Sequence, residues 1–419
     1  MSHYIINGGK KLSGEINVAG SKNAVLALIA ACLLTDEECI VSNVPGILDV
    51  QVMLDIVAEL GVRVQYDRIN KTLVLQAETI QRTELNQELT KKLRASVLLL
   101  GPLLARCNSV TLGSTGGDKI GARSISTHIA ALKDLGAECL VREGFHFSTS
   151  GLVGATIVLE ETSVTATENA LMAAVIAHGT TVIKLAATEP HVQQLAEFLN
   201  TMGAKISGIG NTTLTIEGVS KLRGARIAVI PDANEAASFI TLAAASKSNI
   251  IVTGVPIDYL DDFLLKLKKM GVMFDIGKDW VHVLHPLREY QATKLQVGLY
   301  PKLCSDDMPP LAVLATQAVG ETNMYEWLYE NRLGYAPELN TMGARTEILD
   351  SHRVKITGPT PLKASKLTVS DIRMGMALVI AALIAEGESE ISEIQHIDRG
   401  YEKLEERLNR LGADIVRIK

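Results

Sequence analysis

A short phrase, in which Leu or Met precedes Gly and Ala or Val follows it, recurs six times along the 419 residues. The intervals between its glycines are 75, 67, 68, 72 and 69 residues; the glycines are Gly61, Gly136, Gly203, Gly271, Gly343 and Gly412. Each phrase ends a helix-like pattern and begins a strand-like one. Glycine directly after a helix adopts the left-handed conformation that ends it. The even spacing therefore predicts six structural repeats of about 70 residues.

Each repeat also contains an Ala-rich apolar segment with almost no polar face. These segments cover 24–34, 95–106, 170–178, 236–246, 311–319 and 374–385. A helix that is apolar all round is buried on most of its sides, and a turn and a β-rich run follow each segment. We predict an α/β protein whose central helices are surrounded by sheets. Because the period exceeds that of solenoid repeats, we expect two globular domains of three repeats each.

The composition excludes several functional classes. A net charge of −6 argues against a general nucleic-acid binder, so any anionic ligand must be held by a local group of Lys and Arg. The five cysteines form neither a CxxC pair nor a zinc-type spacing, and we expect reduced, buried thiols and no metal. The chain has no run of about 18 apolar residues and no signal pattern, so we expect a cytoplasmic protein without a membrane span.

The segment 113–123 is a glycine-rich loop that carries ionisable groups. Four of its eleven residues are glycine, and it contains Asp118, Lys119 and Arg123. A mobile loop of this kind is typical of a lid that brings a catalytic group onto a bound substrate. The alternative is an ordinary surface turn with a solvated Asp-Lys pair.

Further ionisable residues lie just ahead of the apolar segments or at their start. Ser21 can cap the first segment, where the free N–H groups of a helix start favour an anion. Capped helices with solvated flanks are the alternative interpretation. Because these residues occupy similar places in their repeats, the repeat itself can bring them together. They are Lys22, Arg94, Asp307, Asp371 and Arg373.

Longer phrases along essentially the whole chain resemble the UDP-N-acetylglucosamine enolpyruvyl transferase family. The phrase at 20–24 and the HIDRGY phrase at 396–401 are the most specific; others lie at 94–96, 101–103, 121–123, 163–164, 166–169, 330–332 and 337–339. The resemblance implies two inverse α/β barrels, each of three βαβαββ units. Residues 1–21 and 232–419 would form the first barrel, and 22–231 the second, which carries the lid at 113–123.

The resemblance also implies a reaction, the first committed step of peptidoglycan synthesis. An enolpyruvyl group would pass from phosphoenolpyruvate to the 3′-hydroxyl of UDP-N-acetylglucosamine, with release of phosphate and without a cofactor. By this resemblance Asp118 is the acid and Asp307 the base. Phosphate and carboxylate would be held by Lys22, Arg123, Arg373 and Arg399. The remaining implied substrate-binding residues are Asn23, Arg94, Ser163, Val164, Leu328 and Asp371.

The chain departs from the family pattern at several positions. Asp118 stands where most lids carry a cysteine; aspartate keeps the proton-donor role but loses the nucleophilic thiol, which predicts insensitivity to the epoxide fosfomycin. A second carboxylate, Asp306, is a rival base, and the phrase at 231–235 lacks an arginine. Glu161 and Thr165, with Leu98 and the segment 124–127, change the implied sugar pocket. Alternatives are therefore a different acceptor, such as a nucleotide or a shikimate-type ring, and an inactive nucleotide-sugar-binding regulatory paralogue. The sequence leaves the oligomeric state open.

Overall fold

The computed structural model describes residues 2–419, which divide into two compact units. Unit 1 contains residues 2–19, Asp118–Ala122 and Pro231–Lys419, and unit 2 contains Gly20–Gly117 and Arg123–Ile230. We predict the whole lid within 22–231, whereas Asp118–Ala122 belongs to unit 1 by its contacts. The predicted barrel limits, 1–21 with 232–419 and 22–231, stay a prediction.

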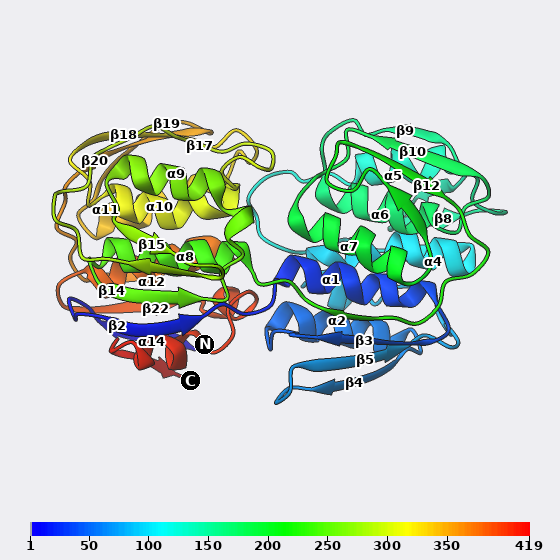
Figure 1. Ribbon diagram of the computed structural model, residues 1–419, viewed down its shortest axis with the longest axis horizontal. Helices are drawn as coiled ribbons and strands as arrows, with labels where there is room; N and C mark the ends of the chain where they lie inside the picture. Colours follow the sequence, from blue (N-terminus) through cyan, green and yellow to red (C-terminus); the bar gives the residue numbers. More distant parts are fainter. Residues whose placement is uncertain (1) are drawn as a thin grey trace. The chain divides into compact units, whose positions relative to one another are not determined.

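Three buried helices form the centre of unit 1 (Figure 1). They are α8 (Ala233–Ala245), α10 (Met308–Ala315) and α12 (Ile372–Ile384), and each packs against the other two. Nearly all of their residues are buried, because small Ala side chains let the helices approach closely while Leu, Ile and Val fill the space between them. These helices correspond to the last three predicted apolar segments.

Three four-stranded sheets cover these helices. The first has the order β21 (Lys366–Thr368), β22 (Glu388–Ser392), β1 (His3–Asn7) and β23 (Ile415–Ile418). The second has the order β15 (Phe274–Ile276), β16 (Trp280–Val283), β14 (Asn249–Thr253) and β2 (Ser13–Asn17). The third has the order β17 (Leu295–Gln296), β18 (Gly320–Tyr325), β20 (Arg353–Gly358) and β19 (Arg345–Asp350). The first and last strands of the chain pair directly, with Tyr4 opposite Arg417.

Unit 2 repeats this plan around α1 (Lys22–Ala31), α4 (Leu100–Cys107) and α6 (Val164–Ala174) (Figure 1). A 3-10 segment, η2 (Arg94–Leu99), precedes α4, so the second predicted helix is only partly α-helical. One sheet has the order β13 (Arg226–Ala228), β3 (Glu38–Ser42), β5 (Thr72–Gln76) and β4 (Arg63–Asp67). Another has β11 (Lys205–Ser207), β12 (Thr213–Glu217), β10 (Thr180–Lys184) and β9 (Thr156–Val158). The third has β6 (Ser109–Leu112), β8 (Phe145–Ser148) and β7 (Glu138–Val141).

One further helix in each repeat ends at the recurring glycine. These helices are α2 (Leu48–Glu59), α5 (Ser126–Asp134), α7 (Pro190–Thr201), α9 (Asp261–Met270), α11 (Tyr335–Thr341) and α14 (Leu404–Arg410). All six phrase glycines have positive φ, from 86° at Gly271 to 105° at Gly203. The left-handed helix end predicted from the phrase is therefore confirmed, as is the fold class of two inverse α/β barrels with three repeats each.

Short helical segments complete the described chain: η1 (Cys32–Leu34), α3 (Gln87–Thr90), η3 (Ile257–Tyr259), η4 (Ser305–Asp307), η5 (Arg332–Gly334) and α13 (Gln395–Asp398). Among the described helices, none is long and apolar enough to cross a bilayer. All five cysteines are free thiols, but only Cys32 and Cys39 are buried. The prediction of buried thiols is wrong for Cys304, which is exposed because it lies in the loop before η4, and only partly right for Cys107 and Cys139.

Candidate active site

Two neighbouring aspartates on η4 begin the candidate site of unit 1. Asp307 is buried, and its Oδ1 accepts no hydrogen bond from the described residues. Burial, and then the negative charge of the neighbouring Asp306, raise the pKa of the Asp307 carboxyl well above its ordinary value. Such a carboxyl is a strong proton acceptor once it is ionised, which suits a general base.

Asp306 lies in the opposite environment, because both of its oxygens accept hydrogen bonds from cations. Arg332 Nη2 donates to Oδ1 at 2.5 Å, and Arg373 Nε donates to Oδ2 at 2.8 Å. Asn234 Nδ2 also donates to Oδ2, at 3.0 Å. The arginine side chains are only 1% and 4% exposed, so these are buried charge-assisted contacts. Of the two rival bases, Asp307 therefore has the oxygen that is free of hydrogen bonds.

Arg373 is fixed from several directions at the start of α12. Its Nη1 donates to the Tyr401 hydroxyl at 3.1 Å, and its guanidinium carbon lies 5.7 Å from the centre of that ring. Asp371 caps the same helix by accepting from the Arg373 backbone N–H at 2.9 Å. Although burial opposes the charge, Asp306 raises the pKa of Arg373 well above its ordinary value. The cation is thus held permanently beside η4.

The lid aspartate lies against the arginine of the HIDRGY phrase. Arg399 Nη1 donates to Asp118 Oδ1 at 2.5 Å, and both side chains are mostly buried. The lid segment is held there by Glu330, whose Oε1 accepts from the Ala122 N–H at 2.8 Å. A Cβ at Gly121 would lie 2.6 Å from Glu330 Oε2, so the lid backbone passes close to this carboxylate. Asp118 and Arg399, predicted as site residues 281 positions apart, are therefore brought together.

In unit 2, Lys22 and Asn23 open helix α1. The predicted cap is confirmed, since Ser21 Oγ accepts from the Ala24 N–H at 3.4 Å. Lys22 Nζ lies 3.6 Å from Oδ2 of the buried Asp49 on α2. The ammonium is therefore positioned at a helix start, where the backbone N–H groups add to its attraction for an anion.

The first part of the lid rests on α3 and on Arg94. Arg94 Nη1 donates to Thr115 Oγ1 at 2.8 Å, and its Nη2 donates to the Arg123 carbonyl at 2.5 Å. The Gly116 N–H donates to the Thr90 carbonyl at 2.9 Å. Arg94 and Arg123, both predicted site residues, are thus in direct contact. Arg94 is not the solvated flank of the alternative interpretation, and 113–117 is not an ordinary surface turn.

Ser163 and Val164 begin helix α6, and Ser163 Oγ caps it by accepting from the Ala166 N–H at 3.4 Å. Two of the departures from the family pattern meet beside this cap. Thr127 Oγ1 donates to Glu161 Oε1 at 3.2 Å, which places an acidic side chain two residues before Ser163. The changed residues therefore gather around one predicted binding position.

His128, which follows Thr127 in the chain, was not identified as a site residue from the sequence. Its Nε2 lies 2.8 Å from Thr165 Oγ1, and the ring is buried. Burial and the nearby Arg94 charge lower the pKa of His128 to about 3, so the imidazole is neutral at physiological pH. A neutral ring offers a hydrogen-bonding edge without adding charge.

The sequence analysis assigned no site role to Arg332 or Glu330, nor to the buried Glu168 and its half-buried neighbour Glu189. Arg332 and Glu330 belong to the phrase at 330–332, where two charges in three residues were the available signal. Glu168 on α6 is fully buried, and burial together with Glu189 raises its pKa well above the ordinary value. The predicted Leu328 lies in unit 1, partly buried against the core.

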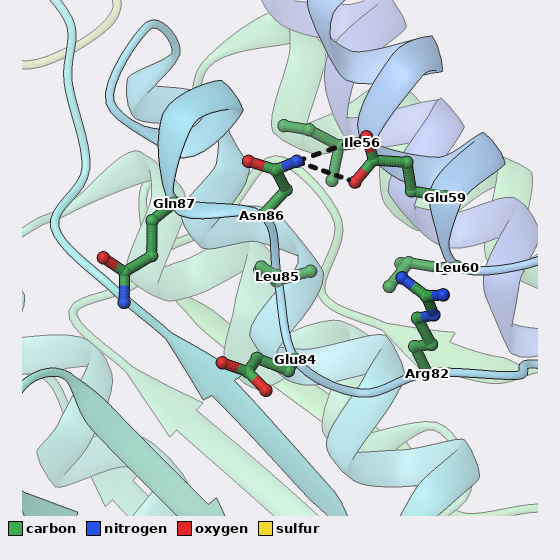
Figure 2. Close-up of a pocket in the computed structure, with 8 residues that line it drawn as sticks. All are labelled: Ile56, Glu59, Leu60, Arg82, Glu84, Leu85, Asn86 and Gln87. Carbon is green, nitrogen blue, oxygen red and sulfur yellow. Dashed lines mark hydrogen bonds between the residues drawn. The ribbon is translucent and has the colours of Figure 1, made fainter.

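A cavity of about 300 Å³ in unit 2 contains none of the predicted site residues. Figure 2 shows it between the end of α2 and the segment that leads into α3, with Asn86 donating to Glu59. Among residues 2–419, no group of three His, Cys, Asp or Glu side chains is arranged as a metal site.

Comparison with known proteins identifies the family of the chain. Residues 6–408 match the family model of EPSP synthase (3-phosphoshikimate 1-carboxyvinyltransferase). UDP-N-acetylglucosamine 1-carboxyvinyltransferases of Bradyrhizobium diazoefficiens and Treponema denticola are 41% and 42% identical to the chain, each over 99% of it and over 98% and 99% of their own lengths. The crystal structure of the enolpyruvyl transferase NikO from Streptomyces tendae superposes with a TM-score of 0.91 at 27% identity, covering 99% of this chain and 98% of that one. The family resemblance predicted from the sequence is confirmed: the chain belongs to the EPSP synthase family of enolpyruvyl transferases.

Proposed function

We propose that this protein is a UDP-N-acetylglucosamine 1-carboxyvinyltransferase. It transfers the enolpyruvyl group of phosphoenolpyruvate to the 3′-hydroxyl of UDP-N-acetylglucosamine and releases inorganic phosphate. The observation that carries the proposal is the buried, hydrogen-bond-free Oδ1 of Asp307 beside two buried arginines. This arrangement provides a base and anion-binding charges within one site. The relatives that share about two fifths of their residues with the chain carry the same name.

The reaction proceeds by addition and then elimination. A proton from the acid is added to C3 of phosphoenolpyruvate, which makes C2 electrophilic. The sugar hydroxyl then attacks C2 while Asp307 accepts the hydroxyl proton. In the second step C3 loses a proton, the C2–O bond to phosphate breaks, and the enol ether is formed. Proton transfer and charge stabilisation are sufficient for these steps, so the proposed reaction needs no cofactor.

Asp118 is the proposed acid on the lid. Its carboxylate lies against Arg399, a residue that we also propose as a ligand of the substrate's anionic groups. An arriving phosphate competes with Asp118 for that guanidinium. A carboxylate displaced next to a second anion favours the protonated form, which is the form that can donate a proton to C3.

The other proposed roles follow the same charges. Lys22, Arg123, Arg373 and Arg399 hold the phosphate and carboxylate of phosphoenolpyruvate. Arg373 uses Nε and Nη1 inside the protein, so its Nη2 remains to bind the substrate. Asp371, which caps the helix that carries Arg373, is proposed to position that arginine. The residues proposed to bind the nucleotide sugar are Asn23, Arg94, Ser163, Val164 and Leu328. Both substrates are phosphorylated metabolites, so we propose that the enzyme acts in the cytoplasm.

The acceptor is the part of the proposal that departures from the family pattern affect most. Glu161, one of the departures from the family pattern, lies beside the Ser163 cap, and its negative charge would repel a nucleotide diphosphate. This observation favours enolpyruvyl transfer to a different acceptor as the second candidate function.

The test is inorganic phosphate release from phosphoenolpyruvate with UDP-N-acetylglucosamine, for the wild type and for Asp118→Asn. We expect turnover in the wild type and a loss of at least about 100-fold in the variant. If the wild type is inactive with this sugar but active with another nucleotide or a shikimate-type ring, the proposed acceptor is wrong and that compound takes its place. A chain that binds the nucleotide sugar and turns over no acceptor would instead be a regulatory paralogue.

A further inference from the structure

The two aspartates of η4 are adjacent in sequence but differ in their surroundings. Asp306 accepts from Arg332, Arg373 and Asn234, whereas Asp307 Oδ1 is buried without a hydrogen bond among the described residues. Both arginines also act on Asp307, since each favours its ionised form. The two guanidiniums therefore act against burial and Asp306, which both favour the protonated form of Asp307.

Two buried cations beside a buried carboxyl normally pair with it, because an unpaired charge is costly in a low-dielectric interior. Asp306 prevents this by accepting Arg332 Nη2 at 2.5 Å and Arg373 Nε at 2.8 Å. Its two oxygens engage one guanidinium each, which fixes a nitrogen of both arginines at Asp306. Arg373 is further held by the Tyr401 hydroxyl at 3.1 Å.

We propose that Asp306 is a positioning residue for enolpyruvyl transfer: its carboxylate holds Arg332 and Arg373 away from Asp307 and so keeps Asp307 a strong base. This inference rests on the proposed function, in which Asp307 accepts the hydroxyl proton. Asp306 is one of the positions at which the chain departs from the family pattern, so the device belongs to this chain rather than to the family pattern.

Four charged groups act on Asp307 in opposite directions. Asp306 on the same turn and Asp232 at the start of α8 favour its protonated form; Arg373 on α12 and Arg332 on η5 favour its ionised form. Burial still favours the protonated form when the Asp306 charge is removed, but one negative charge is lost and both arginines remain, so the titration of Asp307 moves to lower pH.

The decisive variant is Asp306→Asn, which keeps the size and removes the charge. Titration of Asp307 is followed by ¹³C NMR in protein labelled at the aspartate carboxyl carbons, with the Asp307 signal assigned as the one lost in Asp307→Asn. We expect its midpoint to fall by about 1 to 3 pH units in Asp306→Asn. The acidic limb of the kcat/KM profile should move to lower pH with it, and kcat should fall because the base is weaker.

Two control variants separate charge from structure. Asp306→Glu keeps the negative charge, so the midpoint should stay near its wild-type value. Asp350→Asn removes a surface aspartate that pairs with Arg353 at 2.6 Å, and it should leave the Asp307 titration unchanged. A fourth variant, Arg332→Met, removes one cation while Asp306 remains, and should move the midpoint to higher pH. If Asp306→Asn does not fold, this upward shift still tests whether the arginine charges oppose Asp306 in setting the titration of Asp307.

Several results would overturn the proposal. An unchanged Asp307 midpoint in Asp306→Asn, or a downward shift in Arg332→Met, would show that Asp306 does not control the arginine charges. A shifted midpoint with an unmoved acidic limb would remove Asp307, and with it Asp306, from the reaction. The NMR titration needs no turnover. A wild type that is inactive with every acceptor would therefore refute the proposed function, while the NMR midpoints would still show whether Asp306 controls the titration of Asp307.

Discussion

Replacement of Gly116 by alanine should detach the first part of the lid from its support. A Cβ at this position would lie 1.7 Å from the Lys91 carbonyl oxygen and 2.3 Å from its carbon. Both atoms belong to the backbone, so neither can rotate away. The lid must therefore move until the contact reaches about 3.0 Å or more. Such a shift breaks the 2.9 Å bond between the Gly116 N–H and the Thr90 carbonyl.

Two further contacts depend on the same position of the loop. Thr90 Oγ1 donates to the Ser114 carbonyl at 3.1 Å, and Arg94 Nη1 donates to Thr115 Oγ1 at 2.8 Å. With a net value of about 1 kcal/mol for each of the three hydrogen bonds, the native lid position loses about 3 kcal/mol. Since about 1.4 kcal/mol corresponds to a factor of ten, the equilibrium constant between the native lid position and detached positions falls about 100-fold.

The assay is phosphate release by Gly116→Ala, in which kcat should fall by up to about 100-fold. Trypsin cleavage after the exposed Lys119 should become faster as the detached lid becomes more populated, a readout that needs no turnover. Gly334→Ala is the matched control, because its Cβ would meet its nearest atom, Met374 Sδ, at 3.8 Å. The reasoning is refuted if Gly116→Ala keeps wild-type turnover and wild-type resistance to trypsin.

Three other outcomes can be checked independently. Preincubation with fosfomycin should cause no time-dependent loss of phosphate release in the wild type, whereas Asp118→Cys should become sensitive; inactivation of the wild type would contradict this. Glu168 is protonated at low pH and must ionise beside Glu189 as pH rises, because its folded-state pKa lies above the unfolded value. Its contribution to stability is therefore lost as pH rises above the unfolded-state pKa, so Glu168→Gln should gain urea resistance over the wild type as pH rises above about 5, with little difference near pH 4. Glu235→Gln breaks a buried pair in which Arg407 donates at 2.6 and 3.0 Å; urea denaturation should show a loss of about 3 kcal/mol, and an unchanged midpoint would refute that value.

Local patterns were enough to predict the repeats. The six phrase glycines specify left-handed backbone at helix ends, which is a property of the residue itself. The apolar helices were also predictable, because a helix without a polar face must be buried wherever it lies. The least accurate of these predictions was the second helix, where η2 replaces the first turns of the expected α-helix from Arg94 to Leu99.

The family phrases identified most of the residues that the candidate site uses, but not their partners. Asp118 and Arg399 were both predicted, and their contact was not, since 281 residues separate them. Asp306 was predicted only as a rival of Asp307. Its ion pairs with Arg332 and Arg373 span 26 and 67 residues, and no local pattern encodes such distances.

The sequence by itself determined the repeat, the fold class and the chemical types of the site residues, because these depend on backbone preference, hydrophobic pattern and side-chain functional groups. Only the tertiary structure decided which of two adjacent aspartates is buried without a hydrogen bond and which is neutralised by two cations. That difference arises from burial and from charges brought together by distant segments. The low dielectric constant of the interior strengthens these interactions, and this interior forms only once the chain has folded.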